Sequence, residues 1–244
     1  MGQSNPLLEI QSLTKRFGSV NALSDVSFSV RHGEILGLIG PNGSGKTTLF
    51  ECLGGILPSD AGSVLQNGRP LTHEDRSRLL FYLPDAIAPW PAQTVGWALD
   101  YCLGFFDGRS DLKNMVIERL DLLPLLNVRI GKLSKGQRKR ALLGFGLLTP
   151  QPLFIADEPF DGLDLRQVRE VAESLRRFAA GSSRTMLLSI HQISDAARVC
   201  DRFVLLSNGQ VAGQGTLPEL AALTAARGQI ADRSSLEEVF LALT

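Results

Sequence analysis

A glycine-rich stretch at residues 40–47, GPNGSGKT, constrains the fold of this chain more than any other part of its sequence. It fits the pattern G-x-x-x-x-G-K-[ST] of a phosphate-binding loop (P-loop), and it stands between the apolar run 34–39 and the helix-prone segment 47–52. Such glycines let backbone N–H groups turn inward, and the helix that follows adds the positive end of its dipole. The match predicts a strand, a loop for nucleotide phosphates and a helix; the alternative is an ordinary glycine-rich turn between a strand and a helix.

Two side chains of this loop carry chemistry of their own. Lys46 supplies a mobile cation for the outer phosphates of a nucleotide, and the hydroxyl of Thr47 is a ligand for Mg²⁺. The other members offer backbone groups. The expected nucleotide-binding set of the loop is Gly40, Pro41, Asn42, Gly43, Ser44, Gly45, Lys46, Thr47 and Thr48.

Two consecutive carboxylates, Asp157 and Glu158, follow the apolar segment 153–156, which predicts a buried strand. Carboxylates at the end of such a strand need a cation or hydrogen bonds. In P-loop proteins the first of them holds Mg²⁺, which assigns Asp157 as a metal ligand. Glu158 points to the other side of the strand, where it is placed to orient and deprotonate an attacking water. The alternative is a solvent-exposed strand end.

Three further features are candidates for the nucleotide site, and for each of them a purely structural role stays open. Phe17, near a turn, offers a ring that can stack on a base, although a loop phenylalanine is more often core packing. Ser134 and Gln137 have the spacing of a capping box, whose helix N-terminus is an anion site or simply a structural cap. His191 follows the apolar run 185–189, and it would lie at the nucleotide-binding edge if that strand runs parallel to the P-loop strand. A lone histidine is otherwise usually structural.

The rest of the chain alternates between strand and helix patterns, and residues 85–150 read as a mainly helical insertion in an α/β domain. We expect strands at 7–17, 22–30, 63–66 and 79–83, and a hairpin of 203–206 with 210–214. We expect helices at 94–105, 110–123, 138–148 and 165–180, and two short ones after residues 216 and 235. The helix at 165–180 is amphipathic, with an apolar stripe of Leu165, Val168, Ala172, Leu175 and Ala179.

Composition argues against several functional classes. The chain of 244 residues balances 25 lysines and arginines against 25 acidic residues, so we expect no nucleic-acid partner. Because no uncharged apolar run reaches membrane-spanning length, we expect a soluble chain without direct membrane insertion. Three widely spaced cysteines fit a reducing cytoplasm, and the first six residues lack a signal-peptide pattern.

Together these motifs resemble those of the nucleotide-binding subunit of an ABC transporter, and the resemblance covers nearly the whole chain. Their order carries it: an adenine-stacking aromatic at Phe17, Walker A at 40–48, the signature sequence at 133–137, Walker B with its catalytic glutamate at 153–158, a D-loop at 162–164 and a switch histidine at His191. The resemblance implies that Glu158 and His191 are catalytic. It also implies that ATP contacts Ser134, Gly136, Gln137 and Asp164.

The resemblance implies one ABC ATPase domain over residues 1–244, of the α/β P-loop NTPase fold class. It would have a RecA-like core at about 1–84 and 151–215, with an N-terminal antiparallel β subdomain. A helical subdomain at about 85–150 and a helical tail at 216–244 would complete it. Two such domains pack head to tail in this family, so that Ser134 and Gly136 of one subunit close on the γ-phosphate held by Lys46 of the other. ATP, Mg²⁺, a second copy of the chain and a membrane-spanning permease are the implied cofactors and partners.

One residue departs from the family pattern: Asp85 stands where a glutamine usually contacts Mg²⁺. Within the matched signature sequence, Lys135 stands where glycine is commonest. An aspartate is still a hard oxygen ligand, but it is shorter and adds negative charge, so its binding of Mg²⁺ stays open. The loop 84–93, with Trp90 among prolines, would be the docking surface for the permease.

The terminal segment 236–244 resembles the tail of ABC-2-type exporter ATPases, which favours export and a place at the inner face of the cell membrane. The alternative function is a soluble nucleotide-gated module of the kind that acts in translation or DNA repair without a permease. Such relatives carry a second domain, long coiled coils or zinc-binding insertions, and the sequence contains none of these.

Overall fold

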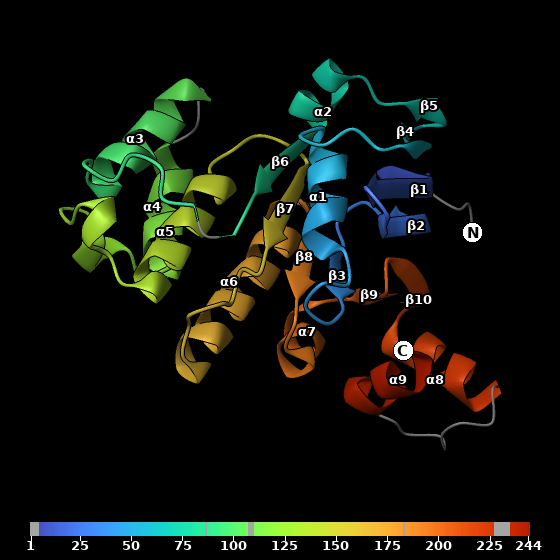
Figure 1. Cartoon of the computed structure of the whole chain (residues 1–244). Coiled ribbons are helices and arrows are strands. Elements are labelled where there is room, and N and C mark those ends of the chain that lie inside the picture. Colours follow the sequence, from blue (N-terminus) through green and yellow to red (C-terminus); the bar gives the residue numbers. More distant parts are fainter. Residues whose placement is uncertain (1–4, 86, 107–109, 183, 227–234) are drawn as a thin grey trace.

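The computed structural model describes residues 5–85, 87–106, 110–182, 184–226 and 235–244. It contains two β-sheets with helices between and around them (Figure 1). Residues 1–4, residue 86 of the expected docking loop and residues 227–234 of the expected tail lie outside the described residues. Nowhere in the described ranges is a helix both long and apolar enough to cross a bilayer.

The smaller sheet is antiparallel and has the strand order β2-β1-β4-β5. Its strands are β1 (Leu8–Phe17), β2 (Val20–Val30), β4 (Ala61–Gln66) and β5 (Arg69–Pro70). Apolar residues of these strands, including Val26 and Val64, share one core with Leu38 of the larger sheet. This is the antiparallel β subdomain that the sequence predicts at the N-terminus, and it covers one face of the larger sheet.

The larger sheet has the order β10-β9-β3-β8-β7-β6. Its strands are β3 (Ile35–Ile39), β6 (Leu80–Leu83), β7 (Leu153–Asp157), β8 (Thr185–Ile190), β9 (Arg202–Ser207) and β10 (Gln210–Gly215). All neighbours run parallel except β10, which pairs antiparallel with β9 in the expected hairpin. Because parallel strands end at one edge, the segments that follow β3, β7 and β8 come together there.

Helices pack against both faces of the larger sheet. Helix α1 (Lys46–Gly54) lies between the two sheets, and α6 (Leu165–Ser182) and α7 (Ile193–Val199) pack with the opposite face of the larger sheet (Figure 1). Helices α3 (Val95–Phe105), α4 (Ser110–Arg119) and α5 (Lys135–Leu147) form a group beyond β6, which we call the helical subdomain (Figure 1). The chain also contains α2 (His73–Leu79), α8 (Leu217–Ala226) and α9 (Leu236–Leu243).

Four details of the expected helices need correction. Helix α5 begins at Lys135 instead of residue 138, because the Ser134 capping box already opens it. Helix α4 ends at Arg119, before a left-handed Asp121 and a short 3₁₀ turn that contains proline. Leu165, the first residue of α6, is 62% exposed, whereas Val171 and Phe178 complete the buried stripe.

The fourth correction concerns two short helices that the sequence patterns miss, α2 and α7. Helix α2 buries only Leu79, so it has no apolar stripe to reveal it, although Thr72 and Asp75 form a capping box at its start. Helix α7 begins at Ile193, two residues after the candidate switch histidine. Tertiary packing of α7 against β3 and α6, rather than local periodicity, accounts for it.

Candidate nucleotide-binding site

The P-loop needs glycine at two positions for steric reasons. A Cβ at Gly40 would lie 2.3 Å from the backbone oxygen of Leu206, on β9. At Gly45 the backbone has φ +105°, and a Cβ would lie 2.5 Å from the backbone oxygen of Ala22, on β2. The loop is therefore enclosed by strands of both sheets, and this close approach leaves no room for a side chain.

The Lys46 side chain curls over the loop that precedes it. Its Nζ donates hydrogen bonds of 2.8 Å to the carbonyl oxygen of Gly40 and 3.1 Å to that of Pro41. Burial lowers the pKa of the ammonium, and the nearby charges of Glu158 and Asp157 oppose that shift. The cation thus lies inside the loop, held by backbone oxygens and facing the acidic end of β7.

A hollow of about 570 Å³ lies over the loop, within the usual size range of small-molecule sites. Six predicted residues line it: Asn42, Gly43, Gly45, Lys46, Thr47 and Thr48. Glu158, directly after β7, also lines it. Five residues that the sequence did not indicate complete its wall: Val20, Asn21, Ala22, Asn208 and Gly209. These come from the start of β2 and the β9–β10 turn, which carry no motif and reach the loop only through the fold.

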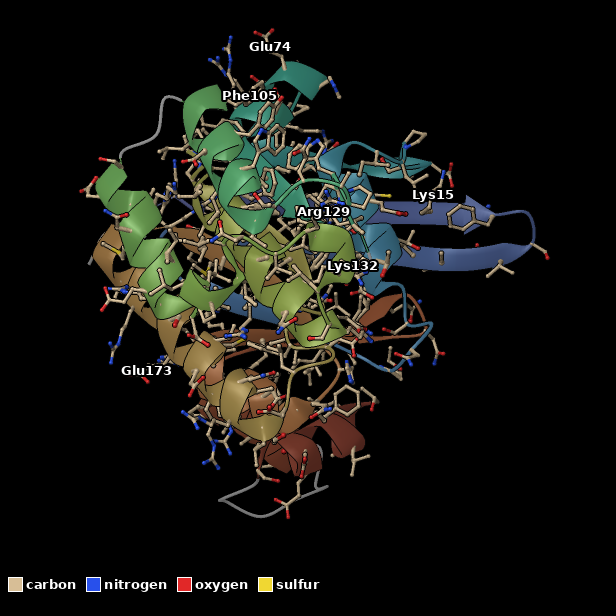
Figure 2. The ribbon with its side chains drawn as sticks, turned by 90° about the vertical axis from the view of Figure 1, so that its left-hand side faces the viewer. Lys15, Glu74, Phe105, Arg129, Lys132 and Glu173 are labelled. Carbon is tan, nitrogen blue, oxygen red and sulfur yellow. The ribbon has the colours of Figure 1, made fainter. Side chains whose placement is uncertain are left out.

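Phe17 lies at the end of β1 and does not line this hollow. Its ring is 47% exposed, and Nζ of Lys15 lies 5.5 Å from the ring centroid. Figure 2 shows Lys15 on the β1–β2 hairpin, which projects from the body of the molecule. The ring is not core packing, and its contact with adenine stays a prediction.

Thr47 and Asp157 meet as the sequence predicts. The Thr47 hydroxyl donates a 2.7 Å hydrogen bond to Oδ2 of Asp157, and the hydroxyl of Ser189 donates to the other carboxylate oxygen. Asp157 is buried at the end of β7. A hydroxyl and a carboxylate are the hard oxygen ligands that Mg²⁺ prefers, so the donor set fits that ion.

Ser189 is a site residue that sequence reasoning missed. The register of β7 and β8 sets Ser189 directly beside Asp157. Its hydroxyl also accepts a 2.9 Å hydrogen bond from the backbone N–H of Glu158. Only the pairing of the two strands reveals this role, because a serine near the end of an apolar run carries no signal of its own.

Glu158 adopts a strained backbone conformation next to His191. Its φ is +47°, a left-handed value that costs a non-glycine residue on the order of 1–3 kcal/mol. Its Oε2 lies 3.3 Å from Nδ1 of His191, which follows β8. The structure therefore brings together both residues that the sequence assigns to catalysis, with the carboxylate also lining the hollow.

The signature segment lies elsewhere. The Ser134 hydroxyl accepts a hydrogen bond from the Gln137 N–H at 3.3 Å, and the Gln137 side chain accepts from the Ser134 N–H at 3.0 Å, which confirms the capping box. A Cβ at Gly136 would lie 2.8 Å from the backbone oxygen of Gly162. Asp164 caps α6 through a 2.9 Å bond from the Gln167 N–H. None of the four predicted residues Ser134, Gly136, Gln137 and Asp164 is among the described residues that line the hollow.

Asp85 has a protein cation as its partner. Its Oδ1 lies 2.6 Å from Nζ of Lys139 on α5, and the Lys139 side chain is only 6% exposed. Lys135, one turn earlier, lies 2.6 Å from Asp161. This hydrogen bond lowers the pKa of the Asp161 carboxyl. Binding of Mg²⁺ by Asp85 stays a prediction.

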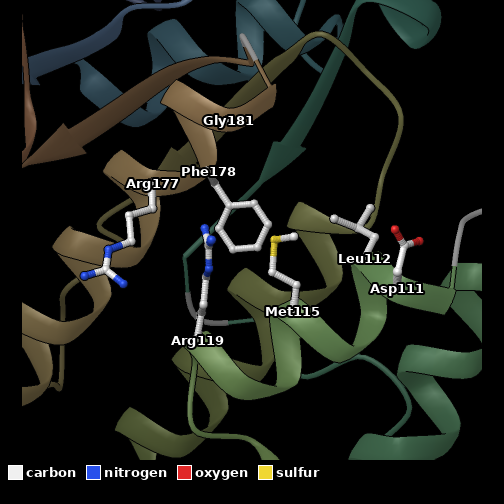
Figure 3. A pocket seen from close by; sticks show the side chains of 7 residues that line it. All are labelled: Asp111, Leu112, Met115, Arg119, Arg177, Phe178 and Gly181. Carbon is white, nitrogen blue, oxygen red and sulfur yellow. The ribbon is translucent and has the colours of Figure 1, made fainter.

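Two of the other hollows lie against the helical subdomain. One of about 280 Å³ lies between α4 and α6, where the Arg119 guanidinium lies 5.1 Å from the ring centroid of Phe178 (Figure 3). The backbone oxygen of Arg119 also accepts a 2.8 Å bond from the Ser174 hydroxyl, so this seam joins the helical subdomain to α6. The other, of about 300 Å³ and lined mainly by apolar side chains, lies between β6, α3 and α5 beside Trp90.

A strand, a glycine loop and a helix, with paired oxygen ligands at the carboxyl edge of a parallel sheet, define a P-loop nucleoside triphosphatase. The family model described as ABC transporter matches residues 23–161. The chain belongs to that family.

Similar proteins agree with this assignment. The SkfA peptide export ATP-binding protein SkfE of Bacillus subtilis (strain 168) is 30% identical over 84% of this chain and 87% of its own length. The sulfate/thiosulfate import ATP-binding protein CysA of Methylococcus capsulatus (strain ATCC 33009 / NCIMB 11132 / Bath) is 31% identical over 87% of this chain and 64% of its own. A solved ATP-binding subunit of an ABC transporter has a TM-score of 0.83 at 30% identity, covering 97% of this chain and 99% of that one. The protein is thus an ATP-binding and ATP-hydrolysing subunit, and its relatives serve both export and import.

Proposed function

We propose that this ATPase binds Mg²⁺–ATP between two copies of the chain and drives a separate membrane-spanning permease in the direction of export. The position of the signature segment carries the proposal. Ser134 and Gly136, which the family resemblance assigns to the γ-phosphate, do not line the hollow over their own P-loop. A second copy, arranged head to tail, would supply them, and Gln137 and Asp164 would accompany them at the interface.

The residues around the hollow suit Mg²⁺ and ATP. Thr47 and Asp157 would hold the metal, with Lys46 and the P-loop N–H groups on the phosphates. Bound Mg²⁺ would neutralise charge on the phosphates. Glu158 would accept a proton from the attacking water, and His191 would hold the carboxylate in position through the contact at its Nδ1.

The apolar hollow beside Trp90 supports a permease as the partner. Trp90 packs edge to face against Trp97 and Tyr101, with ring centroids 5.9 and 5.2 Å away. Trp90, Trp97, Tyr101 and Phe105 are all exposed. Exposed aromatic side chains next to an apolar hollow are typical of an interaction surface. A short helix in a cytoplasmic loop of the permease would pack there, which would hold the ATPase at the inner face of the membrane.

Export is the proposed direction because SkfE, the relative covered to 87% of its length, is a peptide export protein, and because the tail 236–244 resembles that of exporter ATPases. The test is co-purification of the tagged chain from membranes, which should capture a multi-span membrane protein. Trp90→Ala should weaken this capture. Leu241→Ala, which removes another exposed apolar side chain, on α9, should not. Capture of RNA or DNA at physiological salt instead would favour the soluble interaction module.

A further inference from the structure

We propose that Lys139 and Lys135, one turn apart on α5, are positioning residues that fasten the signature helix to the catalytic edge of their own chain. Lys139 does so through Asp85 and Lys135 through Asp161. This proposal rests on the proposed function, because it explains how the signature segment is presented to a second copy. It gives Asp85 the role of counter-ion to Lys139, in place of a ligand for Mg²⁺.

The Lys139–Asp85 pair is the stronger attachment. The lysine side chain is 6% exposed and that of Asp85 35%, with 2.6 Å between Nζ and Oδ1. A buried ammonium is costly without an opposite charge, so removing the carboxylate would leave Lys139 uncompensated inside the protein. Asp85 therefore serves as the counter-ion of Lys139, and this ion pair connects the end of β6 to the middle of α5.

The Lys135–Asp161 pair attaches the first turn of the same helix. Asp161 follows β7, and β7 is the parallel neighbour of β6, with Leu83 beside Ala156. The two carboxylates therefore follow adjacent strand ends, and two lysines spaced i, i+4 on one helix face match them. The Lys135 side chain is exposed, so this contact is weaker than the buried one.

Charge explains why two lysines are needed at this place. Carboxylate oxygens of Asp85, Glu158 and Asp161 all lie within 4.8 Å of one another. Three such groups repel each other and would also repel the phosphates of ATP. The lysines neutralise the two flanking carboxylates, while the partner of Glu158 is His191 at 3.3 Å. Among the described residues, no lysine forms an ion pair with Glu158.

Close backbone packing adds to this attachment. A Cβ at Gly136 would lie 2.8 Å from the backbone oxygen of Gly162, so the start of α5 is seated directly on the D-loop. The position of Ser134, at the N-cap, then depends on contacts made by Lys135, Gly136 and Lys139. Loss of Lys139 should disturb the step in which the signature meets the second copy. It should not disturb binding of ATP to the P-loop of the same chain.

The experiment compares Lys139→Met, Asp85→Asn and the double variant in the purified full chain. We expect Lys139→Met to lower kcat about tenfold or more, with the Kd for ATP changed less than about twofold. In a Glu158→Gln background, Lys139→Met should weaken the dimer that ATP induces. The double variant Asp85→Asn/Lys139→Met removes both charges, and we expect kcat within about threefold of the original. The control is Arg78→Gln, which breaks an exposed i, i+4 ion pair with Glu74 on α2. It should change neither kcat nor the dimer that ATP induces.

Each outcome decides the matter. If the double variant is no better than Lys139→Met, the pairing has no role in turnover and the proposal is wrong. If Lys139→Met is silent while Asp85→Asn raises the Mg²⁺ concentration needed for hydrolysis, Asp85 is a metal ligand and the proposal is also wrong. Failure of Glu158→Gln alone to dimerise with ATP would overturn the proposed dimer instead, and the kcat comparison would still test the lysines.

Discussion

The hydroxyl of Thr47 donates a hydrogen bond of 2.7 Å to the carboxylate of Asp157, although 110 residues separate the two in sequence. This bond joins the first turn of α1 to the end of β7, across the intervening strand β8. Both groups present oxygen atoms at the edge where β3, β7 and β8 end. The structure therefore brings together two of the residues that the sequence proposes as Mg²⁺ ligands.

Replacing Glu158 by Gln should trap an ATP-bound dimer and remove most hydrolysis. The amide keeps the shape of the side chain but cannot accept the proton of water, and a positioned general base contributes on the order of 10²–10⁴-fold. Phosphate release and light scattering with ATP measure the two effects. Glu173→Gln, on the exposed face of α6, is the matched control. Undiminished hydrolysis in Glu158→Gln would contradict the assigned role.

Replacing Gly45 by Ala should abolish nucleotide binding, because the new Cβ would lie 2.5 Å from the backbone oxygen of Ala22. Gly43→Ala is a sharp control, since Gly43 also has a positive φ, +80°, but has nothing within 4 Å of its would-be Cβ. We expect Gly43→Ala to add only the strain of a positive φ in the loop, which would weaken nucleotide binding by about 1–3 kcal/mol. Titration with a fluorescent ATP analogue measures both. Equal losses of ATP affinity in the two variants would show that backbone strain, and not the close approach of β2, determines the effect of Gly45→Ala.

The ion pair between Arg202 and Glu34 should be important for stability. Nη1 of Arg202 lies 3.0 Å from both carboxylate oxygens, and both side chains are buried. Glu34→Gln should lower the free energy of unfolding by about 3–5 kcal/mol, because it leaves a buried charge uncompensated. The double variant Glu34→Leu/Arg202→Met should recover much of the loss. Urea unfolding tests this, and a double variant as unstable as the single one would refute it.

Asp60 should make stability depend on pH. Its carboxylate accepts a 2.6 Å bond from the backbone N–H of Arg16, which lowers its pKa below the ordinary 3.8, and Lys15 contributes further. Since the folded pKa lies below the unfolded one, its stabilisation is full above about pH 4 and is lost as the pH falls through the folded value. The difference in unfolding free energy between the original chain and Asp60→Asn should therefore shrink from pH 7 to pH 3. A constant difference would show that the charge of Asp60 contributes nothing.

Local signals in the sequence predicted much of the fold. The P-loop with its flanking strand and helix, the capping box at Ser134, and the hairpin of 203–206 with 210–214 are all confirmed. Each depends on residues a few positions apart. The place of His191 at the nucleotide-binding edge required only that β8 run parallel to the P-loop strand β3.

Other site features depend on contacts that the sequence pattern does not contain. Ser189 could be found only through the register of β7 and β8. Ala22 encloses the P-loop because the smaller sheet folds over it. Lys139, the partner of Asp85, is 54 residues away, in a segment for which the sequence pattern predicts a helix and no contact with Asp85. Its role becomes visible once α5 is placed against the end of β6.

The position of Ser189 between Asp157 and Glu158 has one further consequence. One hydroxyl group is hydrogen-bonded both to the Asp157 carboxylate, which would hold Mg²⁺, and to the backbone N–H of Glu158, which would activate water. A shift of β8 by one residue would turn this side chain to the opposite face of the sheet, and both bonds would be lost together. Hydrolysis therefore depends on the correct register of β7 and β8. A register error in this sheet would abolish activity even with every catalytic residue unchanged.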